Sequence, residues 1–262
     1  MSKPGTGSRW RKVALRTLAV FAMLACVGAS RAVENDPQNH DSQNHDSQNH
    51  DSQDHESQKV AGAAALIRAG KLDEAEGRLW EVLTRHPENA EALNLLGSIR
   101  LEQKRYAESE TLLRRAISLA PELLPAYMNL ARLFHAQAET DKEVAALLDA
   151  ARLAPSNAEV NCSLAAAYLK QNNYHLALGA LERISGARRP DAALPLLAAS
   201  YLGLGRVEDA RTLAPAVAAG AAKDPGLRVA FAEVLLDFNL TDDALAILEI
   251  AQKQQAPTAE LF

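Results

Sequence analysis

The sequence has few of the residues that an active site or a metal centre needs. Its 262 residues include only two cysteines, Cys26 and Cys162, and no CxxC pair, which excludes a disulfide scaffold and a thiolate zinc or redox site. Aromatic residues make up 5% of the chain. We find no HExxH, GxSxG, P-loop or dinucleotide-binding glycine motif and no strand pattern. The sequence therefore predicts a protein without catalytic activity and without a cofactor.

Basic charge is also scarce. The formal net charge is −5, and residues 59–262 carry 22 Lys/Arg against 26 Asp/Glu. Binding to a phosphate backbone needs a clustered basic face, so we expect no nucleic-acid partner. The apolar fraction of 48% is nevertheless sufficient for a hydrophobic core.

Residues 1–32 have the pattern of an export signal. They carry six Lys/Arg and no acid, and residues 17–29 form an uncharged, mostly apolar run. As a helix this run spans about 20 Å, which is shorter than the hydrocarbon core of a membrane at about 30 Å. We therefore predict a signal peptide that is removed and an exported protein that is periplasmic, outer-membrane-associated or secreted.

Cys26 adds an alternative within this segment. Met23–Leu24–Ala25–Cys26 resembles a bacterial lipobox, in which the cysteine becomes a lipidated mature N-terminus. Lipidation at Cys26 would tether the protein to a membrane, whereas an ordinary cysteine in the apolar run would not. Membrane contact is expected only through the signal segment or through such an anchor.

Residues 33–58 form an acidic linker of low complexity. A pentapeptide of the form QNHDS occurs four times across residues 38–58. With almost no apolar content the linker cannot offset its ordering entropy and is predicted to be disordered. It is either a hydrophilic spacer or, because histidine–acid tracts bind divalent metals weakly, the working part of a metal-binding periplasmic protein. The candidate metal ligands are His40, His45, His50 and His55.

The rest of the chain repeats with a period of about 34 residues. Small residues recur on an expected first helix, at Ala63, Gly97, Ala131, Ala165, Ala198 and Ala232. A second series falls on an expected second helix, at Ala75, Ser109, Glu143, Ala177, Ala210 and Ala244. Four residues further on stand Leu79, Leu113, Leu147, Leu181, Ala214 and Leu248.

The residues between these series predict helix–turn–helix hairpins. Gly or Asn stands between the two helices of four units, at Gly70, Asn172, Gly205 and Asn239, and suits the left-handed residue that ends a helix. Acids open several second helices, where the helix dipole favours them, and a proline closes most units. Because a single hairpin cannot bury its apolar face, the hairpins must stack.

These residues resemble tetratricopeptide repeats. The unit with most of the family pattern is AEALNLLGSIRLEQKRYAESETLLRRAISLAPEL, residues 90–123. The resemblance implies an all-α fold, a right-handed α-solenoid over residues 56–258 followed by a short tail at 259–262. The six expected units are 56–89, 90–123, 124–157, 158–190, 191–224 and 225–258.

Two residues depart from the family pattern. Pro215 is expected to kink or shorten the second helix of the fifth unit. Arg100 occupies a position that is usually apolar, where its side chain can extend to solvent or line a groove.

The resemblance also implies a function, that of a non-catalytic scaffold in the cell envelope with a peptide or protein in a concave groove. Asn94 and Asn129 are the most suggestive groove residues, because an amide both donates and accepts hydrogen bonds. Only Arg132 is a well-placed cation, so a clamp for a peptide carboxylate is not expected. The full set of candidate groove residues is Glu91, Asn94, Ser98, Met128, Asn129, Arg132, Glu159, Cys162 and Ala166.

A more specific alternative is an outer-membrane lipoprotein, similar to the six-repeat pilotins, that assists assembly of a pilus or secretion complex. It rests on the repeat number, the chain length and the lipobox-like sequence at Cys26. No residue pattern predicts an oligomeric state.

Overall fold

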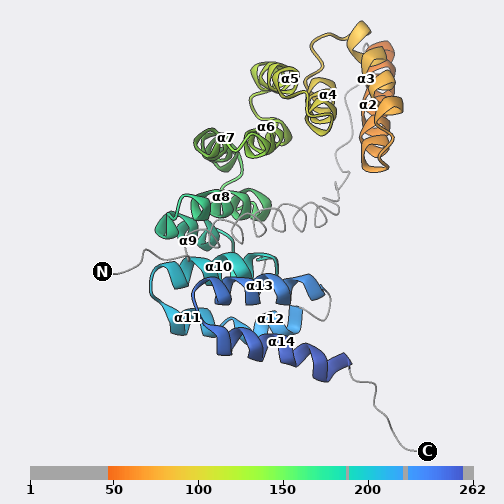
Figure 1. Cartoon of the computed structure of the whole chain (residues 1–262). Helices are drawn as coiled ribbons and strands as arrows, with labels where there is room; N and C mark the ends of the chain where they lie inside the picture. Colours follow the sequence, from red (N-terminus) through yellow and green to blue (C-terminus); the bar gives the residue numbers. More distant parts are fainter. Residues whose placement is uncertain (1–46, 187–188, 221–223, 256–262) are drawn as a thin grey trace, which may run out of the picture. The chain divides into compact units, whose positions relative to one another are not determined.

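The computed structural model describes residues 47–186, 189–220 and 224–255, and within them the regular elements are helices, as predicted (Figure 1). The signal segment, the linker residues 33–46 and the tail lie outside the described residues. The helices fall into two compact units that divide near Ala154. The first unit contains α2 (Ser47–Arg68), α3 (Leu72–Arg85), α4 (Ala90–Glu102), α5 (Tyr106–Leu119), α6 (Leu124–Ala136) and α7 (Thr140–Leu153). The second contains α8 (Ala158–Lys170), α9 (Tyr174–Glu182), α10 (Ala193–Gly203), α11 (Val207–Arg211), α12 (Ala214–Gly220), α13 (Pro225–Asp237) and α14 (Thr241–Gln255).

Each unit is built from hairpins that stack on their neighbours. In the first unit α2–α3, α4–α5 and α6–α7 pair, α4 packs against α2 and α3, and α6 packs against α4 and α5. In the second unit α10 packs against both helices of the α8–α9 hairpin, and α13 packs against α10, α12 and α14. The first helix of a hairpin therefore covers the hairpin before it, which is how apolar faces that one hairpin leaves open become buried.

The small residues of the repeat lie where the two helices of each hairpin approach each other. All six residues of the first series and all six of the second are buried, which confirms both series. At Gly97 a Cβ atom would lie 2.9 Å from the Leu113 side chain, closer than carbon atoms pack. Two polar members of the second series are satisfied locally: Ser109 donates to the Gly97 carbonyl at 2.8 Å, and Glu143 Oε1 lies 2.9 Å from His135 Nδ1.

The turns between paired helices share one backbone conformation. Gly70, Asn172, Gly205 and Asn239 have positive φ angles between 56° and 75°, which confirms the sequence-based turn positions. The two intervening turns use the same conformation at Lys104 and Ala138, with φ of 60° and 59°. Neither residue favours this conformation, so the turn is imposed by the stacking of the hairpins and not by the local sequence.

Two repeats depart from the predicted register. In the fifth, the second helix is broken into α11 and α12 around Pro215, which confirms that prediction. There Val217 is fully buried, whereas the predicted Ala214 is only half-buried. In the sixth, Ile247 is buried and the predicted Leu248 is exposed. The positions three and four residues after Ala244 lie on the same side of the helix, so the spacing allows either residue to be the buried one.

Helix α2 begins within the segment that the sequence analysis assigns to the linker. The structure begins this helix at Ser47, so residues 47–58 of the linker are helical. Its later turns are anchored by Val60 and Ala63, which are buried in the core with α3 and α4. Extending an existing helix adds one hydrogen bond for each residue fixed, which is a gain that composition alone does not describe.

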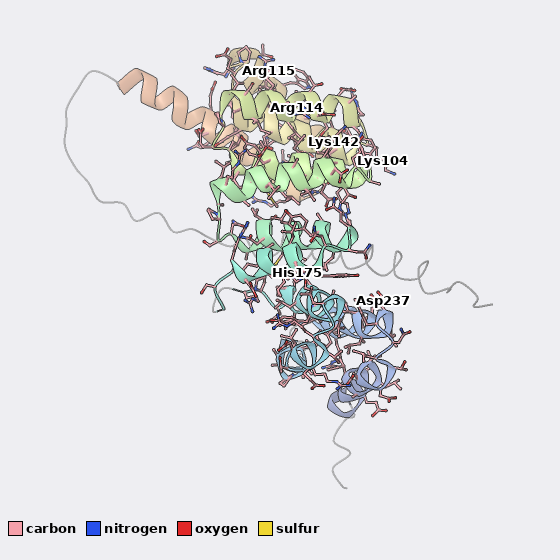
Figure 2. The ribbon with its side chains drawn as sticks, turned by 90° about the vertical axis from the view of Figure 1, so that its left-hand side faces the viewer. Lys104, Arg114, Arg115, Lys142, His175 and Asp237 are labelled. Carbon is pink, nitrogen blue, oxygen red and sulfur yellow. The ribbon has the colours of Figure 1, made fainter. Side chains whose placement is uncertain are left out.

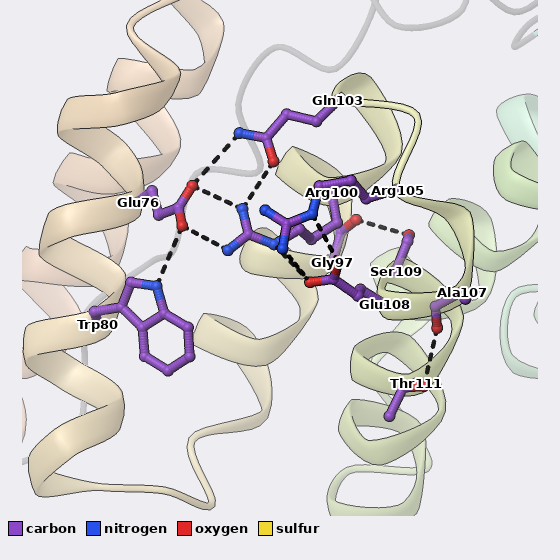
Figure 3. A network of polar contacts seen from close by, with 10 residues as sticks. All are labelled: Glu76, Trp80, Gly97, Arg100, Gln103, Arg105, Ala107, Glu108, Ser109 and Thr111. Carbon is purple, nitrogen blue, oxygen red and sulfur yellow. Dashed lines mark hydrogen bonds and ion pairs between the residues drawn. The ribbon is translucent and has the colours of Figure 1, made fainter.

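Arg100 also differs from the prediction, because its side chain is only 6% exposed and neither reaches solvent nor lines a groove. Its Nη1 and Nη2 donate to the two carboxylate oxygens of Glu76 at 2.7 and 2.5 Å, and its Nε lies 3.4 Å from Glu108 Oε2 (Figure 3). Gln103 Oε1 accepts from Arg100 at 2.8 Å, and Trp80 Nε1 donates to Glu76 at 3.3 Å. The guanidinium group therefore joins α3, α4 and α5. The hydrogen bonds from Arg100 outweigh burial and lower the pKa of Glu76 from 4.5 to about 2.

Replacing Glu76 tests this network. Because the pKa of Glu76 is lower in the folded state, its carboxylate stabilises the fold fully above about pH 4.5, and this contribution is lost as the pH falls towards 2. E76Q should lower the free energy of unfolding by about 2–4 kcal/mol at pH 7, because it removes the nearer of the two carboxylates that compensate the buried Arg100 and leaves only Glu108, at 3.4 Å. The difference from wild type should shrink on acidification, as measured by urea unfolding followed by circular dichroism.

The matched control is E74Q, which removes an exposed partner of Lys71 on the same helix. Exposed pairs contribute about 0–1 kcal/mol, so E74Q should leave the unfolding free energy nearly unchanged. Equal losses in E74Q and E76Q would contradict the role assigned to the Arg100 network.

Candidate peptide-binding surface

The two neighbouring first helices of the first unit carry six of the nine predicted groove residues. Glu91, Asn94 and Ser98 lie on α4 at spacings of three and four, which places them on one face. Met128, Asn129 and Arg132 lie on α6, which packs against α4. The structure therefore brings these two groups onto adjacent helices.

A chain of polar contacts crosses from α4 to α6. Asn129 Nδ2 donates to Asn94 Oδ1 at 2.9 Å, and Arg132 Nη1 donates to Asn129 Oδ1 at 3.3 Å. Arg132 Nη2 also donates to Glu102 Oε1, on the last residue of α4, at 3.0 Å. We call Asn94, Asn129, Arg132 and Glu102 the polar ladder. It fixes α4 and α6 relative to each other by side-chain contacts in addition to apolar packing.

The members of the polar ladder differ in what they offer a ligand. Asn94 is only 5% exposed, so it acts mainly by holding Asn129. The side chains of Asn129 and Arg132 are partly exposed, and Glu102 is exposed. Asn129, Arg132 and Glu102 are therefore the members that solvent reaches, whereas Asn94 is covered.

The other three predicted residues on α4 and α6 differ in how exposed they are. Glu91 is exposed and Met128 is half-buried beside Asn129 in the chain. Ser98 is buried and donates its hydroxyl group to the Leu95 carbonyl at 2.7 Å. Ser98 thus uses its proton within α4, whereas Glu91 and Met128 present surface.

The remaining three predicted residues belong to α8, in the second unit. Cys162 and Ala166 are buried and Glu159 is half-buried. Cys162 packs as a small core residue of α8, at 1% exposure. Burial at Cys162 and Ala166 leaves little surface for a ligand, which corrects their assignment as groove residues.

Arg114 and Arg115 on α5 and Lys142 on α7 are basic residues on second helices of the first unit (Figure 2). Arg114 pairs with Glu110 at 2.9 Å and Lys142 pairs with Glu139 at 2.7 Å. Their cationic groups lie 6.0 and 5.4 Å from the centroid of the Phe134 ring, which they share. These cations are therefore compensated by acids and an aromatic ring, an arrangement unlike a phosphate-binding face.

The predicted metal ligands fall mostly outside the description. His40 and His45 precede the described residues, and His50 and His55 lie in the first turns of α2. Among the described residues no group of three or more His, Cys, Asp or Glu is arranged to hold a metal ion. None of the described helices is long and apolar enough to span a membrane.

Comparison with known proteins relates this architecture to one family. Residues 60–123 match the family model described as tetratricopeptide repeat. None of the curated proteins matches the chain.

Solved structures share the fold at low sequence identity. TTC0263, a thermophilic TPR protein of Thermus thermophilus, is 22% identical with a TM-score of 0.53, covering 69% of this chain and 99% of that one. A tetratricopeptide repeat protein from Parabacteroides merdae is 19% identical with a TM-score of 0.62, covering 78% and 81%. PilF of Pseudomonas aeruginosa is 15% identical with a TM-score of 0.62, covering 78% and 93%.

Proposed function

We propose that this chain, whose residues 60–123 match the tetratricopeptide repeat model, is a non-catalytic scaffold of the cell envelope that binds a protein segment on α4 and α6. The fold is that of a protein–protein interaction scaffold. The single observation that carries the more specific proposal is the polar ladder. It presents amide and guanidinium groups on adjacent first helices.

The chemistry of the polar ladder suits a polypeptide ligand. An asparagine side chain offers donors and an acceptor like those of a peptide bond, so it can pair with a main chain irrespective of the ligand's side chains. The contact between Arg132 and Asn129 is long, at 3.3 Å, and an incoming carbonyl can replace it at small cost. Glu102 holds the other side of the guanidinium group, at 3.0 Å. The site therefore fits an extended peptide and has no preference for a terminal carboxylate.

Site-specific photo-crosslinking tests this surface. A photo-crosslinking amino acid at position 128, next to Asn129 on α6, should give a covalent adduct with a protein in an envelope fraction. The same amino acid at position 111, which is exposed on α5, should give none. Mass spectrometry of the adduct identifies the bound segment, which can then be synthesised for titration.

The titration separates specific from incidental binding. N129A should weaken binding of the identified segment three- to tenfold, because it removes one amide that contributes about 0.5–1.5 kcal/mol. T111A is the matched control and should leave the affinity unchanged. Equal adducts at positions 111 and 128, or an affinity that N129A does not alter, would refute the proposed surface.

Location in the cell envelope forms a separate part of the proposal. It is supported by the basic and apolar pattern of residues 1–32. The lipobox-like sequence that ends at Cys26 favours a second candidate function, that of a lipoprotein that assists assembly of a pilus or secretion complex. The PilF similarity supports a common fold for that candidate.

The intact mass of the protein purified from its own cells decides between these forms. A removed signal peptide predicts a first residue at Ser30 or Val33, and lipidation predicts a diacylglyceryl group on an N-terminal Cys26. A chain that still begins at Met1 in the envelope-free fraction would contradict export.

A further inference from the structure

The hydrogen bonds of the polar ladder fix the orientation of its central amide group, that of Asn129. A guanidinium group has donors and no acceptor, so the atom of Asn129 that lies 3.3 Å from Arg132 Nη1 is the amide oxygen. The nitrogen of the same amide then faces α4 and donates to Asn94 Oδ1 at 2.9 Å. The polar ladder is therefore directional, because turning the Asn129 amide over would place its nitrogen against the guanidinium group.

Both ends of this directional chain are held by the protein itself. Glu102 Oε1 accepts from Arg132 Nη2 at 3.0 Å and holds the guanidinium group from the side of α4. Asn94 is only 5% exposed, so its oxygen is kept in place by the packing around α4. The orientation of Asn129 and Arg132 is thus set before a ligand arrives, which lowers the cost of binding.

Asn129 and Arg132 keep hydrogen-bonding capacity for a ligand. An amide oxygen has two lone pairs and a guanidinium group has five N–H donors. The contacts within the polar ladder use one lone pair of Asn129 and two donors of Arg132. Both side chains are partly exposed, that of Arg132 at 40%. The surface therefore presents an acceptor and a donor 3.3 Å apart in a fixed order.

One residue of an extended polypeptide offers the complementary pair of groups. Its N–H and C=O point to the same side, as in the antiparallel residue pairs that exchange both hydrogen bonds. In an α-helix the same groups are used inside the helix. Proline has no N–H to give. An acceptor beside a donor therefore favours an extended segment and excludes proline at the residue that is bound.

We propose that Asn129 Oδ1 and the Arg132 guanidinium group together bind the N–H and the C=O of one non-proline residue in an extended segment of the partner, and that Asn94 and Glu102 are positioning residues that set this order. The inference rests on the proposed function and deepens it. It states which main-chain groups of the partner are recognised and which conformation and residue type they require.

Two synthetic peptides test this inference on the full chain. The probe is a blocked six-residue peptide of alternating Thr and Val, which favours an extended conformation. The second peptide has the same side chains and a methyl group on every amide nitrogen, so it keeps its carbonyl groups and loses its N–H donors. Binding is measured by NMR titration of the ¹⁵N-labelled protein, followed at the side-chain amide of Asn129. The unmethylated peptide should bind at least fivefold more tightly.

Variants of Asn94 test its positioning role. N94L removes the oxygen that accepts from Asn129, so it should weaken binding of the unmethylated peptide at least threefold and shift the Asn129 side-chain amide resonance in the free protein. N94D keeps an oxygen acceptor and should restore both. The matched control is S98A on the same helix, because the hydroxyl group of Ser98 is buried and donates to the Leu95 carbonyl. S98A should change neither the affinity nor the resonance, and circular dichroism melting curves check that the variants fold.

The outcomes separate this inference from the proposed function. Equal affinity for the two peptides would overturn the inference and leave the polar ladder as a binding surface. Binding of neither peptide would overturn both. An Asn129 resonance and an affinity that N94L leaves as in the wild type would refute the positioning role of Asn94.

Discussion

The structure depends on one constraint, that a helical hairpin cannot cover its own outer face. The two helices of a hairpin must lie close together so that the next first helix can pack on both of them. This close approach requires a small residue where the two helices cross. At Gly97 the requirement is strict, because a Cβ atom there would lie 2.9 Å from Leu113. The buried alanines at the equivalent positions meet the same constraint, and the turns at Lys104 and Ala138 accept an unfavourable backbone conformation to satisfy it.

The same constraint explains how much of the fold could be predicted from the sequence. Spacing alone identifies the twelve buried positions of the two series, eleven of which hold a small residue and one Glu143, because each lies between the helices of its own hairpin. Spacing does not identify the buried residue where two apolar residues stand side by side. Ile247 and Leu248 are both apolar, and only the packing decides that Ile247 is the buried one. The start of α2 at Ser47 was missed for a related reason, since composition describes an isolated segment and not one that continues a packed helix.

The candidate site was predicted less completely, because its polar contacts join residues on different hairpins. Asn94 and Asn129 were selected separately for their amide chemistry, yet the structure shows one holding the other at 2.9 Å. Arg100 was identified as a charge at an apolar position, but its partner Glu76 is 24 residues away on α3, and no spacing rule connects them. Cys162 and Ala166 occupy the groove register of the repeat and are nonetheless buried, so register identifies a helix face without identifying its exposure.

A repeat protein supplies its own reference for such exceptions, since each residue can be compared with the same position in neighbouring hairpins. A charge that replaces an apolar residue, as at Arg100, is compensated inside the stack and serves stability. An apolar residue that is buried in one hairpin and exposed in another, as at Leu202 and Leu236, shows the converse, because the residue type is kept and the packing around it differs. Register and residue type therefore identify the repeat, whereas only the structure identifies which positions are covered.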